Sequence, residues 1–293
     1  MATVLEQEKV LHDISGAGIQ TTAKRWTQQV RFQLRSFYLM GTRVDNIDGD
    51  LALRIVRHYA AERDANRARK IFFTNVHSIC SAQQNEILKH CINLGDLVLP
   101  DGSGVKIGGK VTGNPIIENL NGTDFTPKVL RMAEEEGWSV FLLGAEESIV
   151  RQCCNQLYKT YPDLRIAGYR DGYFGIDEEK KVVEQVNAAR PDILLVALGT
   201  PKQEIWLTRY AHDLNVNVAM AVGGLFDFLS LTKKRAPVWM RRLGIEWLFR
   251  FLHEPSAKWK RIIIEIPMYF SMLFAKRYIP ASIQRTLRKA LFS

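Results

Sequence analysis

One sequence pattern constrains the fold of this chain of 293 residues more than any other. Short apolar runs alternate with stretches in which hydrophobic residues have helical spacing. Seven apolar runs have the length of buried strands, and between them hydrophobic residues recur every three or four positions. The predicted strands are 37–40, 71–75, 97–99, 140–143, 165–169, 193–198 and 216–222, and the predicted helices are 51–63, 83–93, 126–136, 148–161, 178–190 and 203–212. Repeated βα units predict an α/β fold, with a Rossmann-like, mostly parallel sheet covered by helices on both faces.

Charge divides the chain into unequal parts. Residues 233–293 contain 14 Lys/Arg and 3 Asp/Glu, a net charge of +11, so the total of +9 leaves −2 for residues 1–232. We therefore predict an N-terminal extension of unassigned role (1–36), an α/β core (37–232) and a basic, helical C-terminal appendage (233–293). Such an appendage suits phosphates, whether in nucleic acid, in lipid headgroups or in a diphosphate substrate.

The appendage is apolar as well as basic. Trp239, Leu243, Trp247 and Phe251 are spaced by about four residues, which predicts one amphipathic helix over 238–251. The apolar stretch 262–280 contains a glutamate and a proline, whereas a spanning helix needs roughly 20 mostly uncharged residues. We therefore expect it to lie in a membrane interface, and packing on the body or on another subunit is the alternative. Its basic residues would face headgroups: Lys276, Arg277, Arg285, Arg288 and Lys289.

Cysteines and the N-terminus indicate a cytoplasmic protein without a structural metal. Cys80, Cys91, Cys153 and Cys154 lack the spacing of a zinc site or a disulfide framework, so we expect buried free thiols. The first residues carry charges where a signal peptide needs an apolar core. The pair Asp48 and Asp50 could hold magnesium, but Asp50 is better explained as a helix N-cap, so no metal or other cofactor is predicted.

Glycines gather where the predicted strands end. In an open α/β sheet, ligands bind beside the carboxyl ends of the strands, and glycine lets the backbone approach them closely. This predicts a rim that binds a nucleotide or a phosphate, although neither GxGxxG after the first strand nor GxxxxGK[ST] is present. The loop after 193–198 adds a cation and an amide beside the unpaired N–H groups of a helix start. The rim comprises Gly102, Gly104, Gly144, Gly199, Pro201, Lys202, Gln203, Glu204, Gly223 and Gly224.

Three aspartates next to strand ends are candidate general bases. Asp101 lies in Pro-Asp-Gly, Asp124 in Gly-Thr-Asp, and Asp227 between two phenylalanines. A carboxylate in such a place can take a proton from a substrate hydroxyl, or it can cap a helix. His77 is a further candidate, but a histidine after an apolar strand is more often structural.

Taken together, these segments resemble the WecG/TagA/CpsF family of bacterial glycosyltransferases from about residue 37 to residue 261. The order and number of the segments make the resemblance specific, although each one alone is weak. They are FFTNVHSI, DLVLPDGSGV, NGTDF, FLLGAEES, GYRDGYF, PDILLVALGTPKQE, VGGLFDF and KRAPVWMRRLGIEWLFR.

The resemblance implies an inverting, metal-independent glycosyltransferase at the inner face of the cell membrane. Its donor would be a UDP-sugar and its acceptor a polyprenyl-diphosphate-linked sugar in cell-surface polysaccharide synthesis. It makes Asp101 the general base and Asn75 and Gln203 nucleotide contacts, with Asp124, Tyr169, Asp227 and the glycine rim completing the donor site. It also places Arg235, Arg242 and Arg250 over the acceptor diphosphate, a task that suits guanidinium groups.

The chain departs from the family pattern near the sugar. Many members have arginine shortly before the GTD segment, where this chain has Asn119 and Asn121, and threonine where it has Phe73. The donor sugar is therefore not predicted.

Two other classes of function remain open. One is a phosphate-binding, nucleic-acid-associated protein, for which no recognition helix or aromatic-basic platform is visible. The other is an oligomeric binding module that uses the C-terminal stretch as a subunit contact. The glycosyltransferase hypothesis predicts that nucleic acid is not a partner, and it leaves open whether the protein forms a homo-oligomer.

Overall fold

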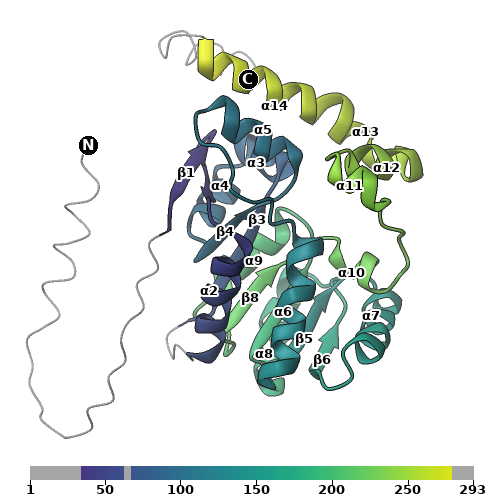
Figure 1. The fold of residues 1–293 in the computed structure, drawn as a ribbon. Helices are drawn as coiled ribbons and strands as arrows, with labels where there is room; N and C mark the ends of the chain where they lie inside the picture. Colours follow the sequence, from purple (N-terminus) through teal and green to yellow (C-terminus); the bar gives the residue numbers. More distant parts are fainter. Residues whose placement is uncertain (1–33, 63–66, 279–293) are drawn as a thin grey trace, which may run out of the picture. The chain divides into compact units, whose positions relative to one another are not determined.

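A six-stranded parallel sheet with the order β4-β3-β8-β7-β5-β6 forms the centre of the protein (Figure 1). The computed structural model describes residues 34–62 and 67–278. Each strand pairs in parallel with its neighbours, which confirms the predicted α/β fold. The strands are β3 (Arg69–Thr74), β4 (Leu97–Pro100), β5 (Ser139–Gly144), β6 (Arg165–Arg170), β7 (Ile193–Ala197) and β8 (Val218–Ala221).

Helices cover both faces because the inner strands are apolar on both sides. On one face, α2 (Gly49–Ala61) and α6 (Gly122–Glu136) lie side by side (Figure 1). On the other, α8 (Glu179–Ala189) and α9 (Lys202–Tyr210) bury residues such as Val182 and Trp206 against Leu194 and Ala219. The remaining elements between the strands are α3 (Val76–Gln84), α4 (Glu86–Asn93), α5 (Ser103–Val111), α7 (Glu147–Thr160), η1 (Ile176–Glu178) and α10 (Leu225–Leu229).

The first predicted strand does not join this sheet. It is β1 (Ser36–Leu39), which pairs antiparallel with β2 (Thr42–Asp45) in a separate hairpin. The mostly parallel sheet is confirmed, but the strand predicted at 37–40 belongs to this hairpin and not to the βα series. A tight turn between β1 and β2 returns the chain at once, so the two strands pair with each other.

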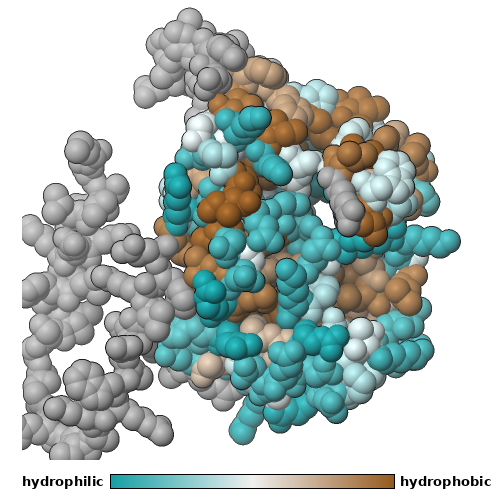
Figure 2. All heavy atoms as spheres, in the orientation of Figure 1, coloured by the Kyte–Doolittle hydropathy of each residue, from teal (hydrophilic) through white to brown (hydrophobic). Residues whose placement is uncertain are grey.

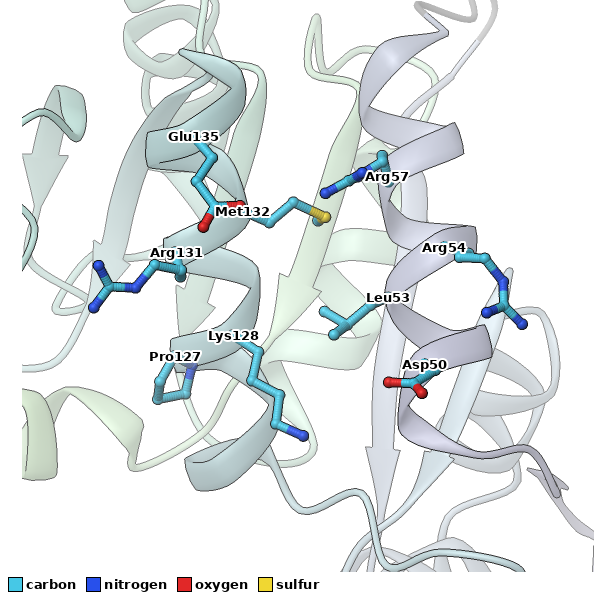
Figure 3. A pocket seen from close by; sticks show the side chains of 9 residues that line it. All are labelled: Asp50, Leu53, Arg54, Arg57, Pro127, Lys128, Arg131, Met132 and Glu135. Carbon is cyan, nitrogen blue, oxygen red and sulfur yellow. The ribbon is translucent and has the colours of Figure 1, made fainter.

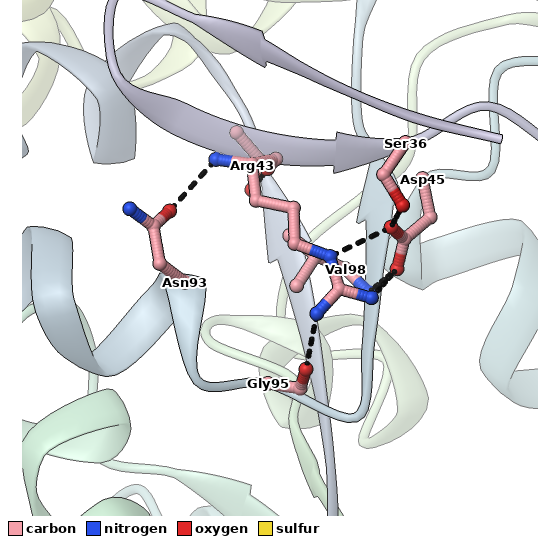
Figure 4. A network of polar contacts seen from close by, with 7 residues as sticks. Ser36, Arg43, Asp45, Asn93, Gly95 and Val98 are labelled. Carbon is pink, nitrogen blue, oxygen red and sulfur yellow. Dashed lines mark hydrogen bonds and ion pairs between the residues drawn. The ribbon is translucent and has the colours of Figure 1, made fainter. Parts of the chain in front are cut away.

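A buried carboxylate attaches the hairpin to the main sheet (Figure 4). Asp45 is fully buried and accepts hydrogen bonds from Arg43 Nε at 2.8 Å, Ser36 Oγ at 2.6 Å and the Val98 backbone N–H at 2.8 Å. Arg43 also donates to the Gly95 carbonyl at 2.8 Å. Because a buried charge is tolerated only when paired and hydrogen-bonded, this network fixes the hairpin beside β4.

Several helix boundaries differ from the sequence expectations. The single helix predicted over 83–93 begins later, because Asn85 caps α4 and ends the separate helix α3. Asp48, not Asp50, caps α2, accepting the Leu51 N–H at 2.7 Å. The glycine-rich helix α5 was not predicted, because glycine lowers intrinsic helix propensity.

The predicted buried free thiols are confirmed. All four cysteines are buried and none forms a disulfide. Burial raises the pKa of the Cys80 thiol to about 12 and that of Cys154 to about 11. These thiols are therefore protonated and unreactive at neutral pH.

The C-terminal part is helical but not continuous. It comprises α11 (Val238–Arg242), α12 (Glu246–His253), α13 (Pro255–Lys260), the π-helical turn η2 (Arg261–Glu265) and α14 (Ile266–Tyr278). The single helix predicted over 238–251 is interrupted because the chain turns at Gly244. One side of α14 packs on α3 and α5, with Tyr269 and Leu273 buried, while Phe274 is 56% exposed.

Among the residues that the structure describes, no helix is both long and apolar enough to cross a membrane. Part of the predicted extension (1–33) and the basic residues Arg285, Arg288 and Lys289 lie outside the described residues.

Candidate active site

The main sheet places Asp101 directly after β4 and Asn75 directly after the neighbouring strand β3. The Asp101 N–H donates to the Thr74 carbonyl at 2.8 Å, which continues the strand pairing by one residue. Asn75 caps α3 through Oδ1, and its Nδ2 donates to Asp101 Oδ2 at 3.3 Å. Both side chains are half-buried at the carboxyl edge of the sheet, so a hydrogen-bonded carboxylate lies where such folds bind ligands.

Two side-chain contacts hold the turn after Asp101. Asn119 Oδ1 accepts the Gly102 N–H at 2.6 Å, and Ser103 Oγ donates to the Gly244 carbonyl at 2.9 Å. The first contact joins the turn to the segment before α6, and the second joins it to the C-terminal helices. Asn119, noted in the sequence only as a departure from the family pattern, therefore supports the turn that carries the candidate base.

The loop after β7 is tied to the loop after β8 by one buried amide. Gln203 is 4% exposed; its Oε1 accepts the Gly223 N–H at 3.0 Å and its Nε2 donates to Glu204 Oε1 at 2.8 Å. Gly199 has φ +75°, and nothing lies within 4 Å of the place where a Cβ would stand. The loop therefore leaves open space beside the backbone where a ligand could approach closely.

Glu204 holds this loop through buried hydrogen bonds. It is 3% exposed, and its Oε1 also accepts a hydrogen bond from Thr200 Oγ1 at 2.9 Å. Burial raises the pKa of the Glu204 carboxyl, although hydrogen bonds from Gln203 and Thr200 act in the opposite direction. The structure thus places Glu204 under the rim rather than on its surface.

A pocket of about 480 Å³ opens at the carboxyl ends of β5, β6 and β7. Lys202 borders it, but its Nζ donates to the carbonyls of Gly172 at 3.2 Å and Phe174 at 3.1 Å. Tyr173 also lines the pocket and is 73% exposed, whereas Tyr169, selected from the sequence, does not line it. The lining residues are Ala145, Gly172, Tyr173, Phe174, Gly175, Ala197, Leu198 and Lys202.

Arginines from the C-terminal segment meet the start of α6. Arg235 Nη1 lies 2.7 Å from Asp124 Oδ1, and Arg241 Nη1 lies 3.6 Å from the same oxygen. Burial alone would raise the pKa of Asp124, but hydrogen bonds from Arg235 and Asn121 and the arginine charges outweigh it and lower the pKa. Asp124 is therefore an ion-pair partner held as a carboxylate.

The family assignment follows from a comparison with known proteins. A model of the glycosyl transferase WecG/TagA/CpsF family matches residues 37–282, which is most of the chain. The chain belongs to this family.

Relatives with assigned activities agree with this membership. The chain is 32% identical over 226 residues to an N-acetylglucosaminyldiphosphoundecaprenol N-acetyl-β-D-mannosaminyltransferase of Bacillus spizizenii, covering 77% of this chain and 86% of that protein. It is 29% identical over 244 residues to a Staphylococcus aureus protein of the same name, covering 82% and 93%. The protein is thus a glycosyltransferase, which favours an enzyme over the two non-catalytic alternatives.

Some predicted site residues of this WecG/TagA/CpsF protein have partners within the protein. Asp227 lies 2.9 Å from Lys233 Nζ, which also contacts Glu254 at 3.1 Å. His77 Nδ1 lies 2.9 Å from Glu265 Oε2, which makes His77 a contact of the C-terminal helices. The side chains of Arg242 and Arg250 lie outside the described part of the chain.

Sequence reasoning missed Arg241 and Tyr173. Arg241 is adjacent to the selected Arg242, and helical spacing alone does not decide which of two neighbouring arginines faces α6. Tyr173 follows an Asp-Gly pair just beyond a strand end, which was an available signal.

Across the described ranges, no three His, Cys, Asp or Glu side chains come close enough together to form a metal site.

A larger groove of about 590 Å³ runs between α2 and α6 on a face of the sheet (Figure 3). It is bordered by side chains of the two helix surfaces, among them Leu53, Arg57, Lys128 and Met132. None of the residues that line it follows a strand end.

Proposed function

We propose that the protein is an inverting glycosyltransferase that moves a sugar from a UDP-sugar to a polyprenyl-diphosphate-linked sugar. The observation that carries the proposal is the position of Asp101 on the same sheet edge as the rim and the pocket. β7, the nearest to β4 of the strands that border the pocket, is three strand positions from β4, or about 14 Å at about 4.8 Å per strand. An extended nucleotide diphosphate sugar can span this length.

In this proposal the donor lies across the edge of the sheet. Its nucleoside occupies the pocket beside Tyr173, its diphosphate passes Gly223 and Gly224 in the loop after the central strand β8, and its sugar reaches Asp101. The sheet order supports this placement, because β3 leads to β4 at one edge and β5 leads to β6 at the other. Ligands of open α/β sheets bind where such connections diverge.

Asp101 would act as the general base. It would take the proton of the acceptor hydroxyl while the oxygen attacks the anomeric carbon from the face opposite the departing UDP. The Asn75 amide, 3.3 Å from Asp101 Oδ2, would orient the carboxylate for this transfer. Because the attack and the departure occur on opposite faces, the anomeric configuration would invert.

The C-terminal segment would hold the acceptor, with residues 37–232 as the catalytic core and 233–293 as the acceptor-binding part. Arg235 Nε and Nη2 and Arg241 Nε are buried and have no hydrogen-bond partner in the described residues. These donors would bind diphosphate oxygens, together with Arg242 and Arg250. The acceptor class follows the names of the relatives, which act on a diphosphoundecaprenol-linked N-acetylglucosamine.

An exposed apolar face would rest on the inner surface of the cell membrane. Figure 2 shows hydrophobic residues gathered over α11–α13 and along α14. Solvent-exposed tryptophans and aliphatic residues of this kind suit a lipid interface. The exposed residues include Val238, Trp239, Leu243, Trp247, Leu252, Trp259, Ile263, Ile264 and Phe274.

A transfer assay tests the proposal. The full-length protein is incubated with UDP-sugars, UDP-N-acetylmannosamine first, and a lipid-diphosphate-linked N-acetylglucosamine, and UDP release is measured with and without the acceptor. We expect acceptor-dependent release, and a product whose anomeric configuration, determined by NMR, is opposite to that of the donor. Absence of transfer with every donor, or a retained configuration, would overturn the proposal.

A further inference from the structure

The C-terminal helices contact the first turns of α5 and α3, the two helices that follow Asp101 and Asn75, at three points. Ser103 Oγ donates to the Gly244 carbonyl at 2.9 Å, and Tyr269 Oη donates to the Gly104 carbonyl at 2.9 Å. The third contact is the pair of His77 Nδ1 with the Glu265 carboxylate, at 2.9 and 3.0 Å from its two oxygens. One partner lies in the α11–α12 turn. The other two, Glu265 and Tyr269, are four residues apart in the uninterrupted helical run formed by η2 and α14.

Each of these contacts ends within three residues of a candidate catalytic side chain. Ser103 and Gly104 follow Asp101 at the start of α5, and His77 follows Asn75 in the first turn of α3. Asn75 and Asp101 are themselves hydrogen-bonded. A shift of either helix start would therefore change the direction in which the Asp101 carboxylate points.

The fit between α14 and α5 is close. Tyr269 is fully buried, and a Cβ added at Gly108 would collide with its hydroxyl. Since only glycine permits this approach, the glycine-rich composition of α5 is explained in part by Tyr269, which requires Gly108, and in part by Val76, which a Cβ at Gly104 would meet. The same composition weakens α5 as an isolated helix, so its position depends on this packing.

We propose that Tyr269 and Glu265 are positioning residues for the general base. They clamp the first turns of α5 and α3 and thereby hold Asp101 and Asn75 in the geometry for proton transfer. The inference rests on the proposed function for its kinetic consequence, because displacing a reacting group by about 1 Å can cost roughly 10²-fold in rate. Neither residue contacts the substrate in this scheme, so the affinity for the donor is unaffected.

The first experiment replaces Tyr269 with phenylalanine, which keeps the buried ring and removes only the hydroxyl. Tyr161→Phe is the matched control, because Tyr161 is also buried and donates to a backbone carbonyl, that of Pro127 at 3.2 Å, away from Asp101. We expect Tyr269→Phe to lower kcat roughly three- to tenfold, in line with the loss of one hydrogen bond, with the donor KM unchanged. Both variants should lose a similar, small amount of thermal stability.

The second experiment removes the contact with His77 by Glu265→Ala. Glu62→Ala is its control, since Glu62 pairs with His58 at 3.3 Å elsewhere on the surface. A fall in kcat is expected only for Glu265→Ala. If either test variant matches its control in kcat, or changes KM alone, the residue is merely structural and the inference fails for it.

Amide hydrogen exchange provides a readout that needs no substrate. In the full-length protein, Tyr269→Phe should speed exchange in residues 101–106 more than Tyr161→Phe does. If the wild type transfers no sugar while this exchange difference is present, the proposed function fails and the clamp stands. If the wild type is active and exchange in 101–106 is equal in both variants, the clamp fails and the proposed function stands.

Discussion

Two hollows in the described part of the protein differ in a way that size does not predict. The groove between α2 and α6 is the larger, about 590 Å³ against about 480 Å³ for the pocket at the ends of β5, β6 and β7. Two of the cations that line it have acidic neighbours on the helix surfaces: Arg57 lies 3.4 Å from Glu136, and Arg131 lies 3.4 Å from Glu134. The smaller pocket lies on the sheet edge that carries Asp101 and the glycine rim.

The two hollows differ in how many backbone N–H and C=O groups they leave free to bind a ligand. On the flank of a helix, N–H and C=O groups are already paired within the helix, so the groove offers only side chains. At a strand end the chain turns, a glycine can bring its backbone to a ligand, and a helix begins with unpaired N–H groups. We infer that the topology of the sheet, rather than the volume of a hollow, locates the chemistry.

The largest expected effect is that of Asp101→Asn. Removing a general base typically costs 10²- to 10⁴-fold, so kcat for sugar transfer should fall by about that factor with little change in the donor KM. Asp50→Asn is the control, because Asp50 lines the groove. If Asp101→Asn retains activity within about tenfold of wild type, or if Asp50→Asn loses as much activity as Asp101→Asn, the proposed difference between the sheet edge and the groove is wrong.

A smaller effect is expected from a methyl group at Gly199. Alanine there would project into the open space beside the loop after β7, where we propose that the donor binds, and we expect the donor KM to rise about tenfold, equivalent to about 1.4 kcal/mol. Gly113→Ala is matched, because Gly113 has φ +79° and open space around it, against φ +75° at Gly199. Both variants should lose about 1 kcal/mol of stability from backbone strain. An equal KM for the two variants would argue against a nucleotide at this loop.

Glu204→Gln should change how stability depends on pH. Burial raises the pKa of Glu204 in the folded protein, so the unfolded chain releases this proton at lower pH than the folded one. The stabilising contribution of the protonated carboxyl is therefore complete below the unfolded pKa and is lost as pH rises through the folded pKa. Glutamine does not titrate. The wild type should thus lose stability relative to the variant over this range, and denaturant unfolding at several pH values would measure it; a constant difference would contradict the assignment.

The smallest effect is expected from Lys128→Ala in the groove. A surface substitution away from any ligand usually changes stability by less than about 0.5 kcal/mol, and kcat and KM should stay at their wild-type values. A clear loss of transfer in this variant, measured in the same assay, would show that the groove takes part in catalysis.

Much of the site was predictable because its residues lie at strand ends that are visible in the sequence. Asp101, Asn75, Gly199 and Gly223 each follow an apolar run, and parallel strands bring their carboxyl ends to one edge. What local patterns could not supply was pairing over long separations. The Asp124–Arg235 ion pair and the His77–Glu265 pair join residues 111 and 188 positions apart.

The sequence by itself determined the α/β class and the division between a nearly neutral part and a basic C-terminal part, because each depends on local composition and periodicity. The site at the carboxyl edge stays a prediction. Tertiary structure alone decided that the first strand leaves the main sheet and that the helix over 238–251 breaks at Gly244. It also decided that Tyr269 packs on the glycines of α5. These outcomes depend on which surfaces meet, and packing between distant segments overrides local propensity.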